Sequence, residues 1–154
     1  MKFTSKTDLN ASLNATFAAF ADFEAFERQG LRAGAEIERI DDLVTPGPGM
    51  MWRVKAEYRG KMRRLEIELV DYDPPNMLKF RAASDLLDAE IKIDLIALSA
   101  KKTRAAVDVN VAAKSLSGRL LLQTARLAKG NLNRRFASGL NRFGVFLENR
   151  IAQA

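Results

Sequence analysis

The amino-acid sequence predicts an α+β fold in which a curved antiparallel sheet of about seven strands wraps around a long C-terminal helix, with two short helices after the first strand. Three observations lead to this prediction. Apolar and charged residues alternate over most of residues 51–111, as in strands with one buried face. Apolar residues recur every three or four positions over residues 117–152, the spacing of one helix face. A shorter helical pattern covers residues 12–29.

The helical pattern over residues 12–29 contains a break. Ser12 is a residue type that caps helix N-termini. Phenylalanine recurs at every third position, a spacing that drifts around one straight helix, so the pattern predicts two short helices that separate near Asp22. These phenylalanines are Phe17, Phe20, Phe23 and Phe26. Gly30 and Gly34 are expected to end the helical stretch.

The clearest part of the predicted sheet is a hairpin over residues 51–69. Alternation is uninterrupted over residues 52–58 and returns over residues 64–69, and Arg59-Gly60 between them suits a tight turn. Residues 2–9 and 35–43 alternate more weakly and are also predicted to be strands.

Three more strands are predicted after the turn signal Asp73-Pro74-Pro75-Asn76. Each has an apolar row on one side and a charged row on the other, and Lys101-Lys102 turns the chain before the last of them. The apolar rows are Leu78, Phe80 and Ala82; Leu87, Ala89, Ile91, Ile93 and Leu95; and Ala105, Val107, Val109 and Val111.

The C-terminal pattern predicts one amphipathic helix of about 35 residues from about Ser117 to Ala152. Its glycines weaken a helix locally, so they suggest kinks or close approaches to the sheet. These are Gly118, Gly130, Gly139 and Gly144. Since a strongly twisted sheet curls, this helix is expected to fill the concave side incompletely and to leave a hydrophobic cavity.

Composition excludes several kinds of chemistry. The chain contains no cysteine and no histidine, which removes disulfides, thiol nucleophiles, thiolate metal sites, Ser-His triads and HExxH zinc sites. Carboxylates on the predicted strands fall on the outward side, which does not provide the desolvated setting that general acid/base catalysis needs. They are Glu66, Glu68, Asp88, Glu90 and Asp94. We therefore expect no catalytic residue, no metal site and no cofactor.

The beginning of the chain predicts a cytoplasmic location. Met1-Lys2-Phe3-Thr4 leads directly into polar, periodic sequence without an apolar signal segment. No stretch approaches the ~18 apolar residues that a membrane span needs.

The order of these elements resembles the START-like helix-grip superfamily, also called SRPBCC. The resemblance is carried by residues 12–26 with Ala21-Asp22-Phe23-Glu24-Ala25-Phe26, by Asp71-Tyr72-Asp73-Pro74-Pro75 followed by Leu78 and Phe80, and by the helix from Ser115-Leu116-Ser117 to Glu148-Asn149-Arg150. It covers nearly the whole chain. It implies the helix-grip fold, a single ligand-binding domain over residues 1–154, and a hydrophobic pocket of the kind found in lipid-transfer and polyketide cyclase/dehydrase-like members. The superfamily has no single catalytic signature, so no catalytic residue is carried over.

The inward positions of the strands and the C-terminal helix are the candidate cavity lining. Each of these residues has the alternative of packing as ordinary core. The candidates are Trp52, Val54, Tyr58, Arg63, Leu65, Ile67, Phe80, Ile91, Ile93, Val107, Val109, Phe136, Leu140 and Phe143.

Tyr58 and Arg63 are the polar members of this set. Tyr58 shares the side of Trp52 and Val54, and Arg63 shares the side of Leu65. An inward charge must pair, reach the rim or meet a ligand, because a buried unpaired charge is costly. Arg63 is therefore either a solvated residue beside the hairpin turn or an anchor for a ligand anion.

The loop Thr45-Pro46-Gly47-Pro48-Gly49 has two interpretations as well. It is either a lid that controls access to the cavity through residues 44–50 and the adjoining helix ends, or an ordinary connection between strands.

Positive charge is concentrated at the C-terminus. Residues 114–154 hold eight of the 25 Lys and Arg residues but one of the 19 Asp and Glu residues. A basic helix of this kind either contacts an anionic membrane as a peripheral surface or simply presents a solvated outer face. Nucleic acid is not expected as a partner, because no aromatic residue interleaves the outer arginines.

The leading functional hypothesis is the binding of a hydrophobic or amphipathic small molecule, such as a lipid, a polyketide or an isoprenoid-like compound. One alternative is a cyclase or dehydratase that acts on such a ligand, with Tyr58 or Arg63 as its polar group. The other is docking of the basic helix onto a partner or an anionic membrane.

Overall fold

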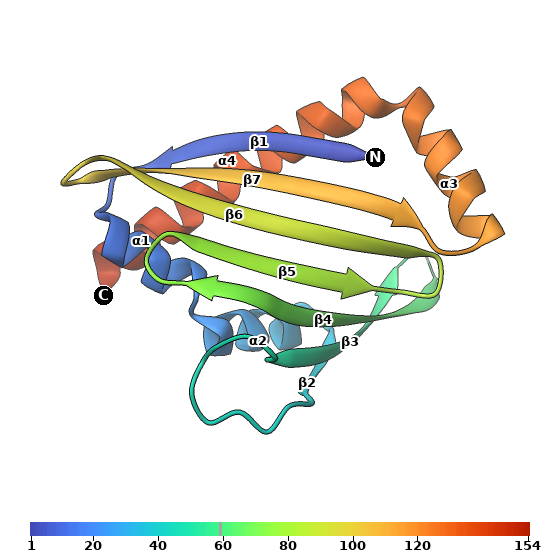
Figure 1. The fold of residues 1–154 in the computed structure, drawn as a ribbon, viewed down its shortest axis with the longest axis horizontal. Helices are drawn as coiled ribbons and strands as arrows, with labels where there is room; N and C mark the ends of the chain where they lie inside the picture. The colour runs from blue at the N-terminus through green and yellow to red at the C-terminus, as the bar shows by residue number, and fades with distance from the viewer. Residues whose placement is uncertain (59) are drawn as a thin grey trace.

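The computed structural model describes residues 1–58 and 60–154, and the side chain of Tyr58 is outside this description. Within these residues, seven strands form one antiparallel sheet in the order β1-β7-β6-β5-β4-β3-β2 (Figure 1). The strands are β1 (Lys2–Leu9), β2 (Glu36–Arg39), β3 (Met51–Tyr58), β4 (Lys61–Asp73), β5 (Met77–Ala83), β6 (Leu87–Ser99) and β7 (Lys102–Ala113). The helices are α1 (Leu13–Phe20), α2 (Phe23–Arg32), α3 (Leu116–Leu127) and α4 (Lys129–Gln153). The predicted α+β, helix-grip class is confirmed.

The inner face of the sheet carries the apolar rows that the alternation predicted. Leu69 on β4 lies opposite Phe80 on β5. A bulge between Leu69 and Asp71 shifts the alternation of β4. Tyr72 therefore points inward, and its ring contacts that of Phe17 with centroids 5.6 Å apart. The bulge also bends β4, which helps the sheet to curve.

The outer face of the sheet carries the charged rows. Lys79 on β5 pairs with Glu90 on β6 at 2.8 Å, and Arg53 on β3 pairs with Glu66 on β4 at 3.5 Å. Cross-strand pairs of this kind add little to stability at exposed positions. Their charges keep this face of the sheet hydrated and favour the observed register.

The break near Asp22 separates α1 from α2 as predicted. Ser12 Oγ accepts a hydrogen bond from the Ala15 amide at 3.2 Å at the start of α1, and Asp22 Oδ1 accepts one from Ala25 at 3.3 Å at the start of α2. The prediction for the end of this stretch was half right. Gly30 lies inside α2 against Ile37 of β2, and Gly34, with φ of 93°, follows the helix end.

The C-terminal segment is two helices, not one helix of 35 residues. The chain turns at Ala128, which closes α3 and precedes α4. Two of its glycines are sites of close approach, as expected: a Cβ on Gly118 would overlap the carbonyl oxygen of Leu86, and one on Gly144 would lie 3.1 Å from Thr7 of β1. No helix in the described part of the chain is long and apolar enough to cross a membrane.

The helices cover the sheet unevenly. Helix α4 packs mainly on β1 and α1, α1 contacts β6 and β7, and α2 contacts β2 (Figure 1). The expectation that the long helix fills the concave side is therefore only partly right, because α4 follows one edge of the sheet. The inner face of β3, β4 and β5 is covered mainly by the side chains of the two short helices.

The strand predicted over residues 35–43 is shorter than expected, since β2 ends at Arg39. Beyond it, Asp41 turns its carboxylate back onto the chain and accepts hydrogen bonds from the amides of Leu43 at 2.9 Å and Met51 at 2.8 Å. These bonds replace the strand pairing that residues 41–43 would otherwise make.

Candidate functional site

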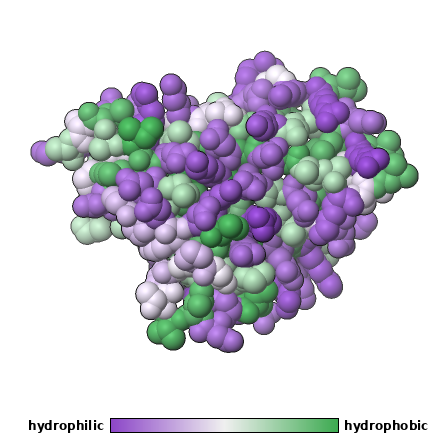
Figure 2. All heavy atoms as spheres, viewed as in Figure 1, coloured by the Kyte–Doolittle hydropathy of each residue, from purple (hydrophilic) through white to green (hydrophobic). Residues whose placement is uncertain are grey.

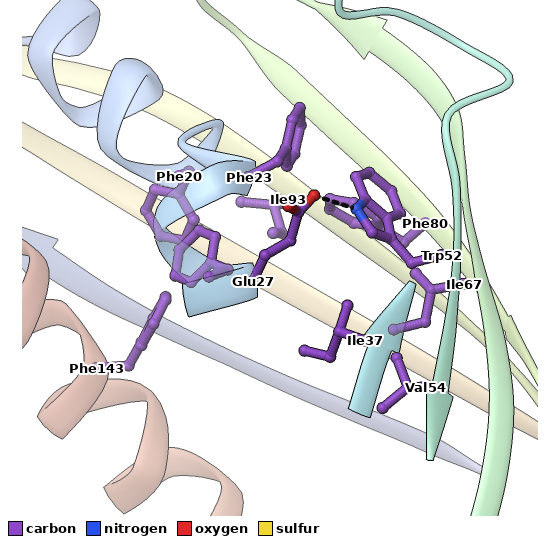
Figure 3. Close-up of a pocket in the computed structure, with 11 residues that line it drawn as sticks. Phe20, Phe23, Glu27, Ile37, Trp52, Val54, Ile67, Phe80, Ile93 and Phe143 are labelled. Carbon is purple, nitrogen blue, oxygen red and sulfur yellow. Dashed lines mark hydrogen bonds between the residues drawn. The ribbon is translucent and has the colours of Figure 1, made fainter. Parts of the chain in front are cut away.

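An apolar cavity of about 300 Å³ lies between the inner face of the sheet and the helices (Figure 3). Three groups of elements line it: the short helices α1 and α2, the strands β2 to β6, and α4. The lining residues are Phe20, Phe23, Phe26, Glu27, Ile37, Trp52, Val54, Ile67, Phe80, Ile93 and Phe143.

Aromatic rings build one wall of the cavity. Phe23 at the start of α2 contacts Trp52 of β3 and Phe80 of β5, with ring centroids 5.3 Å and 6.2 Å apart. Phe20 and Phe26 both contact Phe143 of α4, each with centroids 5.8 Å apart. The break at residue 22 makes this possible, because it lets phenylalanines from two successive helices turn toward the same space.

Glu27 is the one charged residue in the described lining. Its Oε1 accepts a hydrogen bond of 2.8 Å from the Trp52 indole nitrogen, as the dashed line in Figure 3 marks. Trp52 is 6% exposed, so its N–H needs a partner inside the protein. The bond ties α2 to β3 and holds the carboxylate at the cavity wall.

A second polar group lies beside this wall, since Arg39 on β2 is directly opposite Trp52 on β3. The Arg39 guanidinium lies 5.9 Å from the centroid of the Trp52 ring and donates two hydrogen bonds to Asp41, at 2.6 Å and 2.9 Å. The hydrogen bonds from Arg39 hold the pKa of the Asp41 carboxyl well below its usual range, and the amides of Met51 and Leu43 act in the same direction. The charge of Arg39 is thus matched by Asp41.

The chemistry of this lining follows from its composition. It offers a large apolar surface, one carboxylate, and one indole N–H that the carboxylate already uses. Such a site encloses an apolar molecule and contacts it through one polar group at the wall.

The structure brings six of the predicted lining residues together around the cavity: Trp52, Val54, Ile67, Phe80, Ile93 and Phe143. Val107 and Leu140 are buried in the core, and Ile91, Val109 and Phe136 are partly buried against it. Leu65 is half-buried on β4 opposite Val54. These six positions contribute to packing around the site and not to its described lining.

The two polar candidates and the loop are placed elsewhere. The side chain of Tyr58 is outside the described residues. Arg63 is exposed on β4 opposite Ala56 and is not part of the lining. The loop over residues 45–49 contributes no residue to the lining either.

Five lining residues were not predicted as site residues: Phe20, Phe23, Phe26, Glu27 and Ile37. The phenylalanine spacing did indicate that these rings turn inward, but it gave no reason to separate lining from core. Glu27 has no signal of its own in the sequence, since a glutamate on a short polar helix is typical of a solvated face.

The comparisons with known proteins agree on the fold. No protein-family model and no curated protein sequence matches this chain. Among solved structures, Ara h 8.0201 superposes with a TM-score of 0.66 at 15% identity, covering 100% of this chain and 99% of the other. A START superfamily protein from Mycobacterium smegmatis gives a TM-score of 0.57 at 15% identity, covering 91% and 99%. The Zhui aromatase/cyclase from Streptomyces sp. R1128 gives 0.60 at 12% identity, covering 75% and 69%.

At these identities the likeness establishes the fold alone. The chain therefore has the START-like helix-grip fold that the order of its sequence elements resembled.

Proposed function

We propose that this chain, as a single domain over residues 1–154, binds a hydrophobic or amphipathic small molecule in the cavity between the sheet and its helices. The observation that carries the proposal is the cavity itself: about 300 Å³, with a lining that is apolar except for Glu27. This volume lies at the lower end of the range of roughly 300–1,000 Å³ for small-molecule sites. The ligand class is a small lipid, polyketide or isoprenoid-like molecule.

The placement of the helices explains why the space stays open. Since α4 follows β1, the strands β3 to β5 are covered mainly by side chains from α1 and α2, and α4 contributes Phe143 to the lining. Val54 and Ile67 at the cavity wall are half-buried, so part of the inner face has no protein packed upon it. A ligand that covers this apolar surface gains about 25 cal/mol for each Å² removed from water.

The similar structures support the same class of function. One is an aromatase/cyclase and another is a START superfamily protein. Both share only the fold with this chain, so they support the proposal by analogy. Of the two polar residues of the cyclase or dehydratase alternative, Arg63 lies outside the described lining.

Blocking the cavity tests the proposal. In Val54→Phe, the larger ring should occupy space beside Ile67, and the affinity for N-phenyl-1-naphthylamine, a neutral fluorescent apolar probe, should fall about tenfold or more. Val145→Phe is the matched control, because Val145 is 56% exposed on α4 and is not part of the described lining. Fluorescence titration measures both. Equal affinity in the two variants, or no binding to the unmodified protein, contradicts the proposal.

A second candidate function is favoured by the surface of α3. Leu116, Leu120 and Leu127 are 73%, 57% and 91% exposed, and their spacing of four and seven residues places them on one face. The opposite face is buried through Gly118 and Leu122. Figure 2 shows hydrophobic atoms at the end of the molecule where Figure 1 places α3.

The charge around this leucine face suits an anionic phospholipid bilayer. Arg119 and Arg126 flank it, and neither forms an ion pair among the described residues. Residues 114–147 contain no Asp or Glu. Leucines bordered by arginines are typical of helices that lie in a membrane interface. We therefore propose that α3 is the part of the basic C-terminal segment that contacts an anionic membrane.

Co-sedimentation with vesicles of phosphatidylcholine, with and without 30 mol% phosphatidylserine, tests this contact. Binding should require phosphatidylserine and weaken as salt rises. Leu120→Gln and Arg126→Glu should each reduce it severalfold. Ile96→Gln on β6 and Arg142→Glu on α4 make the same changes at exposed positions elsewhere and should leave it intact. Binding without phosphatidylserine would contradict the contact with an anionic membrane. Equal effects of the paired variants would rule out α3 as the docking element.

A further inference from the structure

We infer that Glu27 makes the cavity selective for the head group of its ligand. A ligand whose polar end is a hydrogen-bond donor or a cation is accepted, and one whose polar end is a carboxylate is rejected. The ligand class is therefore an apolar amine, alcohol or phenol, not a free fatty acid. This inference rests on the proposed function, because it concerns the ligand of the same cavity.

The first step is the inventory of polar groups that face the cavity. Among the described lining residues, Glu27 and the Trp52 indole are the ones with polar side-chain atoms. The indole N–H is a donor only, and its 2.8 Å hydrogen bond to Glu27 Oε1 uses it. A ligand with a polar end therefore meets an acceptor at this wall.

The second step concerns the oxygen that the indole leaves available. Oε1 takes the hydrogen bond from Trp52, and no hydrogen bond to Oε2 occurs among the described residues. Trp52 is buried between Phe23 and its neighbours, so it fixes the direction of the carboxylate. Figure 3 shows Glu27 reaching from α2 toward the indole nitrogen of Trp52. A donor on the ligand can bind Oε2 without displacing Trp52.

The third step is the absence of a cation that would accept a ligand carboxylate. Arg39 is the candidate beside the site, since its guanidinium lies close enough to Glu27 for their charges to interact. Its guanidinium is held by Asp41 through two hydrogen bonds and by the Leu43 carbonyl at 3.3 Å. It stands over the ring of Trp52 and is not part of the lining.

These observations determine which head group the cavity prefers. A carboxylate placed in this cavity would lose its hydration, find no donor in the described lining and face another carboxylate. An ammonium or hydroxyl group would lose its hydration too, but it would gain a charge-assisted hydrogen bond to Glu27. A hydrogen bond to a charged group is strong enough to separate the two classes of ligand by about tenfold or more.

Displacement of N-phenyl-1-naphthylamine by octylamine, octanol and octanoate tests the inference, since the three share one chain and differ in the head group. Octylamine and octanol should displace the probe at concentrations at least about tenfold lower than octanoate. In Glu27→Gln the advantage of octylamine over octanoate should fall to less than about threefold. The amide oxygen of glutamine still accepts from Trp52, so the wall keeps its shape.

Glu24→Gln is the matched control. It removes the same charge from an exposed position on the same helix and should leave the order of the three ligands unchanged. Octanoate displacing as well as octylamine from the unmodified protein overturns the inference, and so does an unaltered order in Glu27→Gln. Both of these results leave cavity binding intact. Failure of the probe to bind at all overturns the proposed function itself and the inference with it.

Discussion

Asp41 is the residue that connects the end of β2, the following loop and the start of β3 beside the cavity wall. Its carboxylate joins Arg39 at the end of β2, the Leu43 amide in the loop and the Met51 amide at the start of β3. Its side chain is 7% exposed, whereas that of its partner Arg39 is 33% exposed. Arg39 in turn stands over Trp52, which connects this cluster to the site.

Asp41→Asn should destabilise the protein by about 2 kcal/mol at neutral pH, since it removes charge-assisted hydrogen bonds to a buried group. The pKa of Asp41 is lowered on folding from its ordinary value of 3.8. Its contribution to stability is therefore complete above pH 3.8 and is lost as pH falls through the lower folded-state pKa.

Urea denaturation at several pH values checks this prediction. The difference between the unmodified protein and Asp41→Asn should be constant near neutrality and should shrink in acid. Asp42→Asn, at an exposed neighbouring position, should show no such difference. A gap between the unmodified protein and Asp41→Asn that stays constant into strong acid would contradict the assigned role.

Single residues differ in how far the sequence predicted their place. Trp52 and Phe143 were expected at the inner face because they fit the strand and helix periods, and both line the cavity. Glu27 was not expected there. Its inward position depends on a hydrogen bond to a residue 25 positions away, which no local pattern encodes.

At the scale of elements, Gly118 shows how a helix is positioned by a missing side chain. It lies in the first turn of α3, where a Cβ would overlap the backbone carbonyl oxygen of Leu86. A backbone carbonyl in a connected loop cannot move aside as a flexible side chain can. Gly139 on α4 differs, because a Cβ there would meet nothing closer than Arg142 Nη2 at 3.9 Å.

Two alanine substitutions should therefore change the free energy of unfolding in opposite directions. Gly118→Ala is expected to destabilise the protein by about 1–3 kcal/mol through overpacking. Gly139→Ala is expected to stabilise it by up to about 1 kcal/mol, because alanine has the higher helix propensity and the site has room. Thermal unfolding followed by circular dichroism measures both. Stabilisation by Gly118→Ala would contradict the close approach of α3 to the loop before β6.

Element boundaries were predicted best where the chain has strong turn residues. Gly60, with φ of 73°, lies between β3 and β4, and the turn after Asp73 ends β4. The bulge at Leu69 and the shortened β2 were not predicted. Both are accompanied by contacts with other segments that no local pattern encodes: Tyr72 packs on Phe17, and Asp41 accepts a hydrogen bond from the amide at the start of β3.

At the scale of the whole molecule, the path of α4 decides where the cavity lies. Helix α4 is fixed at both sides of its C-terminal half: Gly144 lies against Thr7 of β1, and Arg150 pairs with Asp22 at 2.9 Å. Glu148 also accepts a hydrogen bond from the Asn10 amide. These contacts hold α4 along β1 and leave the opposite part of the inner face to be covered mainly by side chains of α1 and α2.

The structure also locates the excess of positive charge in the C-terminal segment. It belongs to two helices with different surroundings. The described part of α3 projects leucines and arginines into solvent, whereas α4 turns Leu140 and Leu147 into the core. The proposed membrane contact therefore concerns α3 and its flanking arginines.

The sequence by itself determined the α+β class, the order of the elements, the inward face of most of the sheet and the break between α1 and α2. These follow from periods of two and 3.6 residues, from capping residues and from turns, all of which act over a few positions. Only the tertiary structure decided the split of the C-terminal segment at Ala128, the path of α4 along β1, and the position of Glu27 in the wall. The physical reason is that periodicity fixes which side of an element is apolar, while a cavity is the space that packed elements fail to fill. That space depends on close approaches and hydrogen bonds between residues distant in the chain.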